Sequence, residues 1–175
     1  MYWANFLHIY QPSNQMPDIL ERITNESYRK LFRGLLANPK AKLTLNINAG
    51  LTEQLDRYGY TDIIRDIKKL AERGQIEFTE SAKYHPFMPL TPWEENERQI
   101  KLNHETNKFY FGKIYKPLGF FPPEMAYSRK VADLVSSLGY RWMVADEISY
   151  NGKTEQLSYD KTYTIKGLNN FKIFF

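Results

Sequence analysis

The chain has 175 residues, of which 42% are hydrophobic and 25% charged, a composition that excludes an intrinsically disordered protein. Its net charge is +4, and its basic residues are scattered rather than clustered in a block, which argues against a nucleic-acid partner. The absence of cysteine excludes disulfides and thiolate metal sites, while the lack of a signal peptide or an apolar run of ~18 residues predicts a cytoplasmic protein without a membrane span.

Short apolar runs alternate with helical patterns in the first third of the chain. Residues 3–10 (WANFLHIY) form an apolar and aromatic run that ends at a Gln-Pro pair, which predicts a buried strand. Pro17 begins a helical stretch that Pro39 ends. Residues 43–47 (LTLNI) predict the second strand, closed by an Asn-Ala-Gly turn.

The clearest amphipathic helix follows, and its apolar residues recur at i, i+3, i+4, i+7 and i+10. They are Tyr60, Ile63, Ile64, Ile67 and Leu70. Gly74 is placed to end this helix, and residues 75–79 (QIEFT) predict the third strand. Thr91, Pro92 and Glu94 have the form of a capping box, which predicts a long helix to about Tyr115.

The last third of the chain repeats the strand and helix alternation. Residues 119–121 predict a very short fourth strand that runs directly into Pro122, Pro123 and Glu124. Ser128 is placed to cap the next helix. Two further segments predict a fifth strand and then a hairpin or two edge strands, at residues 140–145 and at residues 162–165 with 171–175.

The order of these elements favours an α/β domain over residues 1–175, with a parallel sheet that is either open or closed into a barrel. In such folds, functional residues collect at the carboxyl ends of the strands. Polar residues follow the strands of this sequence repeatedly: His8, Tyr10, Gln11, Glu77, Glu80, His85, Glu124, Asp146 and Glu147.

Glu124 is the most informative of these residues. Two prolines stiffen the backbone before it, and the preceding apolar residues imply a buried strand. We therefore expect a carboxylate held rigidly at the rim of a dry, aromatic-lined pocket, as a nucleophile requires. The alternative is a buried ion pair of Glu124 with Arg129 or Arg141.

Three segments resemble, in order and spacing, the first three signature regions of glycoside hydrolase family 57. They are residues 8–12 (HIYQP), 74–77 (GQIE) and 119–127 (GFFPPEMAY). The resemblance implies an incomplete (β/α)7 barrel and a retaining enzyme that hydrolyses or transfers α-glycosidic bonds in α-glucans. It also implies an oligosaccharide or α-glucan partner and no cofactor or metal.

Carried over residue by residue, the resemblance makes Glu124 the catalytic nucleophile. His8, Gln11 and Glu77 match residues that bind the sugar or orient the nucleophile. His85 matches a segment that borders the same cleft, and a looser match places Trp142 and Asp146 near the active site. One departure is Tyr10, because many family members have a second histidine there.

A second departure concerns the acid/base, which the family takes from an Asp in a fourth region further downstream. No segment up to Phe175 resembles that region, so we expect a barrel truncated after about five to six strands, a fragment of a longer protein with little or no activity. A retaining glycosidase needs two carboxyl groups roughly 5 to 5.5 Å apart. The missing strands predict an apolar edge that favours self-association, made of Phe171, Ile173, Phe174 and Phe175.

Two other functions remain open from the sequence. A non-catalytic glycan-binding module or a degenerate barrel needs only aromatic platforms and polar groups, which Trp142, Tyr10 and Tyr84 supply. A polysaccharide deacetylase needs an Asp and two histidines close together, commonly at i and i+4. No His-x3-His exists here, and His104 is expected to be a packed or half-exposed structural residue.

Overall fold

Seven strands form one sheet, in the order β1-β2-β3-β4-β5-β7-β6, in the computed structural model, which describes residues 4–158 and 160–175. Neighbouring strands are parallel, except that β6 and β7 are antiparallel. The strands are β1 (Phe6–Ile9), β2 (Leu43–Ile47), β3 (Ile76–Glu80), β4 (Gly119–Phe120), β5 (Trp142–Val144), β6 (Tyr163–Thr164) and β7 (Lys172–Phe174). The predicted α/β fold is confirmed, and the sheet is not closed, as expected of an incomplete barrel.

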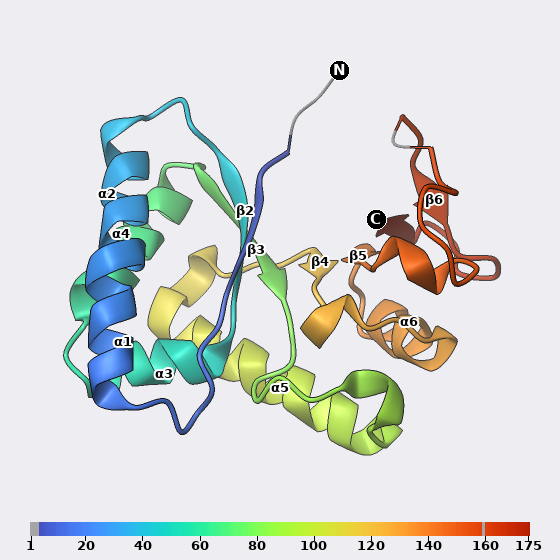
Figure 1. Cartoon of the computed structure of the whole chain (residues 1–175), viewed down its shortest axis with the longest axis horizontal. Helices are drawn as coiled ribbons and strands as arrows, with labels where there is room; N and C mark the ends of the chain where they lie inside the picture. The colour runs from blue at the N-terminus through green and yellow to red at the C-terminus, as the bar shows by residue number, and fades with distance from the viewer. Residues whose placement is uncertain (1–3, 159) are drawn as a thin grey trace.

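The helices pack against one face of this sheet (Figure 1). The α-helices of the described ranges are α1 (Pro17–Ile23), α2 (Arg29–Ala37), α3 (Ala49–Arg57), α4 (Thr61–Glu72), α5 (Trp93–Phe111) and α6 (Arg129–Ser137). One π-helical turn, η1 (Thr24–Tyr28), joins α1 to α2, and short 3-10 turns are η2 (Met88–Leu90), η3 (Gly112–Ile114), η4 (Pro123–Met125) and η5 (Glu147–Ser149). No described helix is long and apolar enough to cross a membrane.

The hydrophobic core lies between the sheet and the helices in two clusters. The first cluster joins β1, β2 and β3 to α1 through α4, and includes Leu45 and Phe78. The second joins β4, β5 and β7 to α6, and includes Phe120 and Met143. Since strand residues alternate in direction, their neighbours in sequence point to the other face, which none of the described α-helices covers.

One helix was missed by the sequence prediction, namely α3 (Ala49–Arg57). Residues 48–50 were interpreted as a turn that closes a strand. In fact, Asn48 is the N-cap of α3, and its side chain accepts a hydrogen bond from Gly50 N at 2.9 Å. The inner face of α3 includes buried Thr52 and Gln54, so the helix lacks the apolar stripe that would have revealed it.

The predicted capping box was also wrong. The N-cap of α5 is Pro92, whose ring offers no acceptor, and the hydroxyl of Thr91 donates instead to Phe87 O at 3.1 Å. Ser128, in contrast, caps α6 as predicted, because its hydroxyl accepts from Val131 N at 3.3 Å.

The expected apolar edge is only partly present. Phe171 and Ile173 are buried in the second core cluster, and the edge of the sheet is β6 rather than β7. Phe174, on the opposite side of β7, is 44% exposed. The pairing of β6 with β7 explains the difference, because it packs the residues of the hairpin against α6 and β5. Self-association through this edge stays a prediction.

Candidate active site

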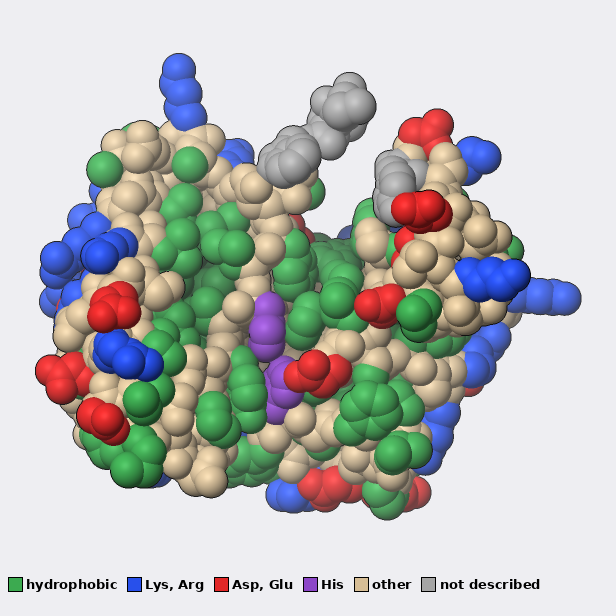
Figure 2. Space-filling view, viewed as in Figure 1, with side chains coloured by type: hydrophobic (Ala, Val, Ile, Leu, Met, Phe, Trp, Pro, Cys, Tyr) green, Lys and Arg blue, Asp and Glu red, His purple; other side chains and the backbone are tan. Residues whose placement is uncertain are grey.

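The uncovered face of the sheet contains a cavity of about 560 Å³. Register places Phe6, Thr44 and Glu77 side by side at one level of β1, β2 and β3, and His8, Asn46 and Thr79 at the next level toward the carboxyl ends. The cavity is lined at the lower level by residues from both halves of the sheet. They include Phe6, Glu77, Phe121, Met125, Trp142 and Phe174. Figure 2 shows that this face is hollowed, with two histidines at its middle.

Trp142 lies flat against β4 because residue 119 is glycine. A Cβ added at Gly119 would lie 2.1 Å from the indole atoms Cε2 and Cζ2 of Trp142, which is far inside van der Waals contact. The Trp142 ring also makes an edge contact with Phe174, with ring centroids 5.6 Å apart. Gly119 therefore permits the aromatic wall of the cavity.

Glu124 follows β4 in a left-handed backbone conformation. Its φ is 60°, and the next residue, Met125, has φ of 50°. Non-glycine residues adopt this region at a cost of about 1–3 kcal/mol each, and such residues cluster at functional sites. Hydrogen bonds from Met125 N to Pro122 O, at 2.8 Å, and from Ala126 N to Pro123 O, at 3.1 Å, hold the turn.

The Glu124 carboxylate is in contact with a histidine. His85 Nδ1 lies 3.6 Å from Glu124 Oε1, and the two side chains are 7% and 71% exposed. The expectation of a dry pocket is therefore not met, because most of the Glu124 side chain is exposed to solvent. The predicted alternative, an ion pair with Arg129 or Arg141, is not formed; Arg129 binds Asp133 at 2.7 Å instead.

Five aromatic rings from three parts of the chain form a continuous stack beside Glu124. Centroid distances along the stack are 4.0 Å, 5.3 Å, 4.6 Å and 5.4 Å. In order, the rings are Tyr10, His85, His8, Phe121 and Phe6. We call Glu124, His85, His8 and Tyr10 the Glu124 site.

The orientation of His8 is set by Asn46 from β2. Asn46 Nδ2 donates to Thr79 Oγ1 at 3.1 Å and to Glu80 O at 3.4 Å, so Asn46 Oδ1 must be the atom that faces His8. That oxygen only accepts, and it lies 2.7 Å from His8 Nδ1, which must therefore carry the proton. In the neutral ring, Nε2 of His8 is then the acceptor.

Burial and charge determine the ionisation of this site. Burial lowers the pKa of His8, against opposing effects of the Asn46 hydrogen bond and the Glu124 charge. Burial and then the neighbouring His8 lower the pKa of His85, while Glu124 raises it. The pKa of Tyr10 is raised by burial and by Glu124. At neutral pH the Glu124 carboxylate thus has uncharged polar rings beside it, which suit a neutral, hydroxyl-rich ligand.

His85 is held by a loop whose backbone is fixed on several sides. Asn48 Nδ2 donates to Ala82 O at 2.6 Å, and Gln99 Oε1 of α5 accepts from Tyr84 N at 3.0 Å. Ser81 Oγ donates to Phe121 O at 2.8 Å, which connects the loop to the segment between β4 and Glu124. His85 itself has φ of 54° and a buried Nε2 without a partner among the described residues. A ligand hydroxyl is the natural partner for that nitrogen.

A second carboxylate, Glu80, lies at the end of β3 on the helix-covered face and is 0% exposed. Asn103 Nδ2 and the Tyr115 hydroxyl donate to its Oε1 at 2.6 and 2.9 Å, and the Tyr140 hydroxyl and His104 Nδ1 lie 3.0 and 2.9 Å from its Oε2. We call these five residues the Glu80 cluster. Burial, followed by the Glu80 charge, raises the pKa of Tyr115 and Tyr140. The His104 side chain is 35% exposed, and its contact with Glu80 is consistent with the predicted packed or half-exposed structural residue.

The predicted site residues fall into three groups. Glu124, His8 and His85 lie together, while Glu77 and Trp142 line the cavity next to them. Gln11 is directed elsewhere, with its Nε2 donating to the Tyr28 hydroxyl at 3.2 Å. The Asp146 side chain caps η5 by accepting from Ile148 N at 2.9 Å, although Asp146 N donates to Met125 O.

The sequence reasoning missed Asn46, Phe121 and the Glu80 cluster. Asn46 had a visible signal, since it is the polar residue inside the buried strand LTLNI. Glu80 was recognised only as a polar residue at a strand end, and its surroundings come from residues distant in the sequence. In the described ranges, no group of three or more His, Asp or Glu side chains is arranged to hold a metal ion.

Comparisons with known proteins identify the family and the fold of the chain. The family model described as "Glycosyl hydrolase family 57" matches residues 3–175. Alpha-amylase 1 of Dictyoglomus thermophilum is 24% identical over 151 residues, which are 86% of this chain and 21% of the amylase. The chain thus spans about a fifth of the length of this curated relative.

Solved structures show the same fold. The 4-alpha-glucanotransferase from Thermococcus litoralis superimposes with a TM-score of 0.83 at 22% identity, over 98% of this chain and 27% of that one. A putative polysaccharide deacetylase from Mycobacterium smegmatis has a TM-score of 0.57 at 13% identity, covering 81% of this chain and 50% of that one. Both likenesses are of fold alone, since each pair of chains is less than 25% identical in sequence.

Proposed function

This chain belongs to glycosyl hydrolase family 57, and from that premise we propose that it is the N-terminal part of a catalytic barrel that hydrolyses or transfers α-glycosidic bonds in α-glucans. In this proposal Glu124 is the nucleophile of a retaining reaction. The relatives that support it include an alpha-amylase and a 4-alpha-glucanotransferase. The observation that carries it is the Glu124 site itself, a carboxylate in left-handed backbone beside a buried histidine.

The reaction has two displacements. A Glu124 oxygen bonds to the anomeric carbon as the bond from that carbon to the leaving oxygen breaks, and the leaving oxygen takes a proton from a general acid. Water, or a hydroxyl of another sugar, then gives its proton to the same acid/base group as its oxygen bonds to the anomeric carbon, and the bond from that carbon to Glu124 breaks. The first acceptor gives hydrolysis and the second gives transfer.

In this proposal the general acid is not one of the described residues. Asp146 uses its carboxylate to cap η5, and Glu77 lies one level lower on the sheet than His8. His85 lies beside Glu124 and offers Nε2 to a sugar hydroxyl, while His8 and Trp142 contact the sugar ring. Glu77 and Trp142 bind the part of the substrate that enters the cavity.

An activated substrate tests the nucleophile without the general acid. In α-maltosyl fluoride, the fluoride leaves without protonation, so a covalent maltosyl adduct is expected on Glu124 of the 175-residue chain, measured by mass spectrometry and peptide mapping. Glu124→Gln should carry no adduct, and Glu94→Gln, an exposed glutamate of α5, should be labelled like the wild type. Labelling of another carboxylate, or of Glu124→Gln, would contradict the proposal.

A second candidate is glycan binding without turnover. It is favoured by the 71% exposure of the Glu124 carboxylate and by the ready-made aromatic stack beside it. This candidate predicts saturable binding of maltooligosaccharides that Glu124→Gln leaves unchanged, together with no adduct from α-maltosyl fluoride. Isothermal calorimetry and the same mass measurement separate the two candidates.

A further inference from the structure

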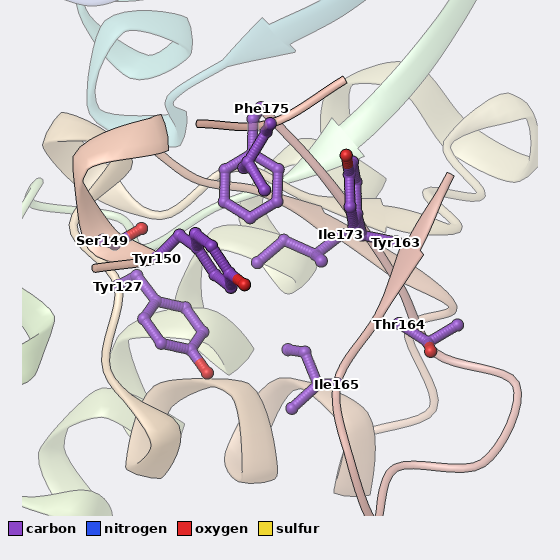
Figure 3. Close-up of a pocket in the computed structure, with 9 residues that line it drawn as sticks. Tyr127, Ser149, Tyr150, Tyr163, Thr164, Ile165, Ile173 and Phe175 are labelled. Atoms are coloured by element: carbon purple, nitrogen blue, oxygen red, sulfur yellow. The ribbon is translucent and has the colours of Figure 1, made fainter. Parts of the chain in front are cut away.

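A second pocket lies on the other side of β7, away from the Glu124 site. It has a volume of about 230 Å³ and is formed by the segment after Glu124, the turn η5 and the β6–β7 hairpin. Figure 3 shows Tyr127 and Tyr150 next to each other on one side, Tyr163 and Thr164 on the other, and Ile173 between them. We call this the tyrosine pocket, defined by Tyr127, Tyr150, Tyr163, Thr164 and Phe175.

Some hydroxyl groups of the pocket have hydrogen-bond partners among the described residues and others do not. The Tyr163 hydroxyl is satisfied, because it accepts from Ser158 N at 2.7 Å and donates to Ser158 O at 3.2 Å, so this residue serves as a wall. Within the described residues, the hydroxyls of Tyr127, Tyr150 and Thr164 form no hydrogen bond. Tyr150 is moreover 61% exposed, with its ring directed along the pocket in Figure 3. Among the described residues, the Tyr127 and Tyr150 hydroxyls are thus free beside an aromatic space, while the Thr164 side chain points away from its middle in Figure 3.

The charge of the lining side chains and the volume of the pocket limit the class of ligand that fits. None of the side chains that line the pocket is charged, which disfavours phosphates, carboxylates and ammonium groups. The volume is below the roughly 300–1,000 Å³ typical of sites for drug-sized ligands, so one ring fits and an oligomer does not. Aromatic walls with a few hydroxyls match a pyranose, which has apolar C–H faces and equatorial hydroxyls at its rim.

We propose that the tyrosine pocket binds one neutral pyranose ring, as a second carbohydrate site separate from the Glu124 site. That the ring is the terminal glucosyl unit of an α-glucan rests on the proposed function. Tyr127 lies three residues after Glu124, so the two sites share one segment of chain. The ring packs on Tyr150, and one of its hydroxyls exchanges a hydrogen bond with the Tyr127 hydroxyl.

The test is a titration of the 175-residue chain with methyl α-glucopyranoside, followed by amide NMR. We expect saturable shifts at Ser149, Thr164 and Ile165. Tyr150→Ala should weaken binding about tenfold through loss of the stacking ring, and Tyr127→Phe about threefold through loss of one hydrogen bond. Tyr58→Ala, at an exposed tyrosine that follows α3, is the matched control and should leave this affinity unchanged.

Several outcomes would overturn the assignment. Unchanged affinity in Tyr150→Ala, shifts confined to the Glu124 site, or no saturable shifts would remove the pocket as a sugar site. Tighter binding of cyclohexyl methyl ether, an apolar ring of similar size, or of glucose 6-phosphate would exclude a neutral pyranose as the ligand. The adduct experiment on Glu124 is independent, because its failure leaves the tyrosine pocket in place and its success does not support the pocket.

Discussion

Glu80 and Glu124 stand at the ends of the neighbouring strands β3 and β4, yet their surroundings are opposite. Glu80 is 0% exposed, and four side chains of the Glu80 cluster surround its two oxygens. Glu124 is 71% exposed, has left-handed backbone, and its carboxylate lies 3.6 Å from His85 Nδ1. The Glu80 carboxylate, whose oxygens are all hydrogen-bonded, connects the sheet to its helices. The Glu124 carboxylate, which lies on a strained turn and is exposed, is able to bind a ligand.

The largest effect is expected from Glu80→Ala. This change leaves the Tyr115 and Tyr140 hydroxyls and the Asn103 amide without their buried acceptor, so the free energy of unfolding should fall by about 3–5 kcal/mol. Urea unfolding at pH 7 measures it. Glu124→Gln should change the unfolding free energy by less than about 0.5 kcal/mol, as an exposed position does. Equal losses in the two variants would erase the contrast between the sites.

A smaller effect of opposite sign is expected at position 124. Glycine tolerates a φ of 60° without the steric cost of a Cβ, so Glu124→Gly should be more stable than Glu124→Ala by about 1 kcal/mol. The alanine variant is the matched control, because it removes the same carboxylate and keeps the strain. If alanine proved as stable as glycine, the turn would not be strained in solution.

The smallest effect concerns the pH dependence of stability. The pKa of both His8 and His85 is lowered by folding from the ordinary value of 6.5, so the unfolded chain binds more protons below that pH. The free energy of unfolding should therefore fall as the pH is lowered through 6.5 toward the folded pKa values. Urea unfolding between pH 5 and 7.5 measures this slope.

A His8→Gln, His85→Gln double variant is the control, because it should have a flatter slope than the wild type. The same slope in the double variant, or stability that rises as the pH falls, would show that the two histidines are not buried in the neutral form.

Local patterns predicted most of the sheet. Strand β2 has its predicted bounds, and α4 follows its apolar repeat, because these elements bury a continuous stripe that the sequence displays. α3 was missed because tertiary partners satisfy its buried polar residues, as when the Thr52 hydroxyl donates to Asn107 Oδ1 of α5 at 2.8 Å. No local pattern encodes such a pair.

The candidate active site was also predicted only in part. The proline-stiffened turn identified Glu124, and the family resemblance assigned His8 and His85 to one cleft, where their rings stack. The separate roles of Glu80 and Glu124 were not predictable from the sequence. Both glutamates follow apolar strand residues, and the sequence does not show that Glu80 is buried under the helices whereas Glu124 is exposed. Asp146 illustrates the limit, since its side chain caps a turn that the sequence did not reveal.

The most direct test of the Glu124 site is an NMR titration of the His8 and His85 rings in the wild type and in Glu124→Gln. Because the Glu124 charge raises the pKa of both histidines, its removal should lower both values. Glu77→Gln, one level lower on the same face, should leave them unchanged. Histidine pKa values that do not change in Glu124→Gln would contradict the site, because the carboxylate would then not share it with His8 and His85.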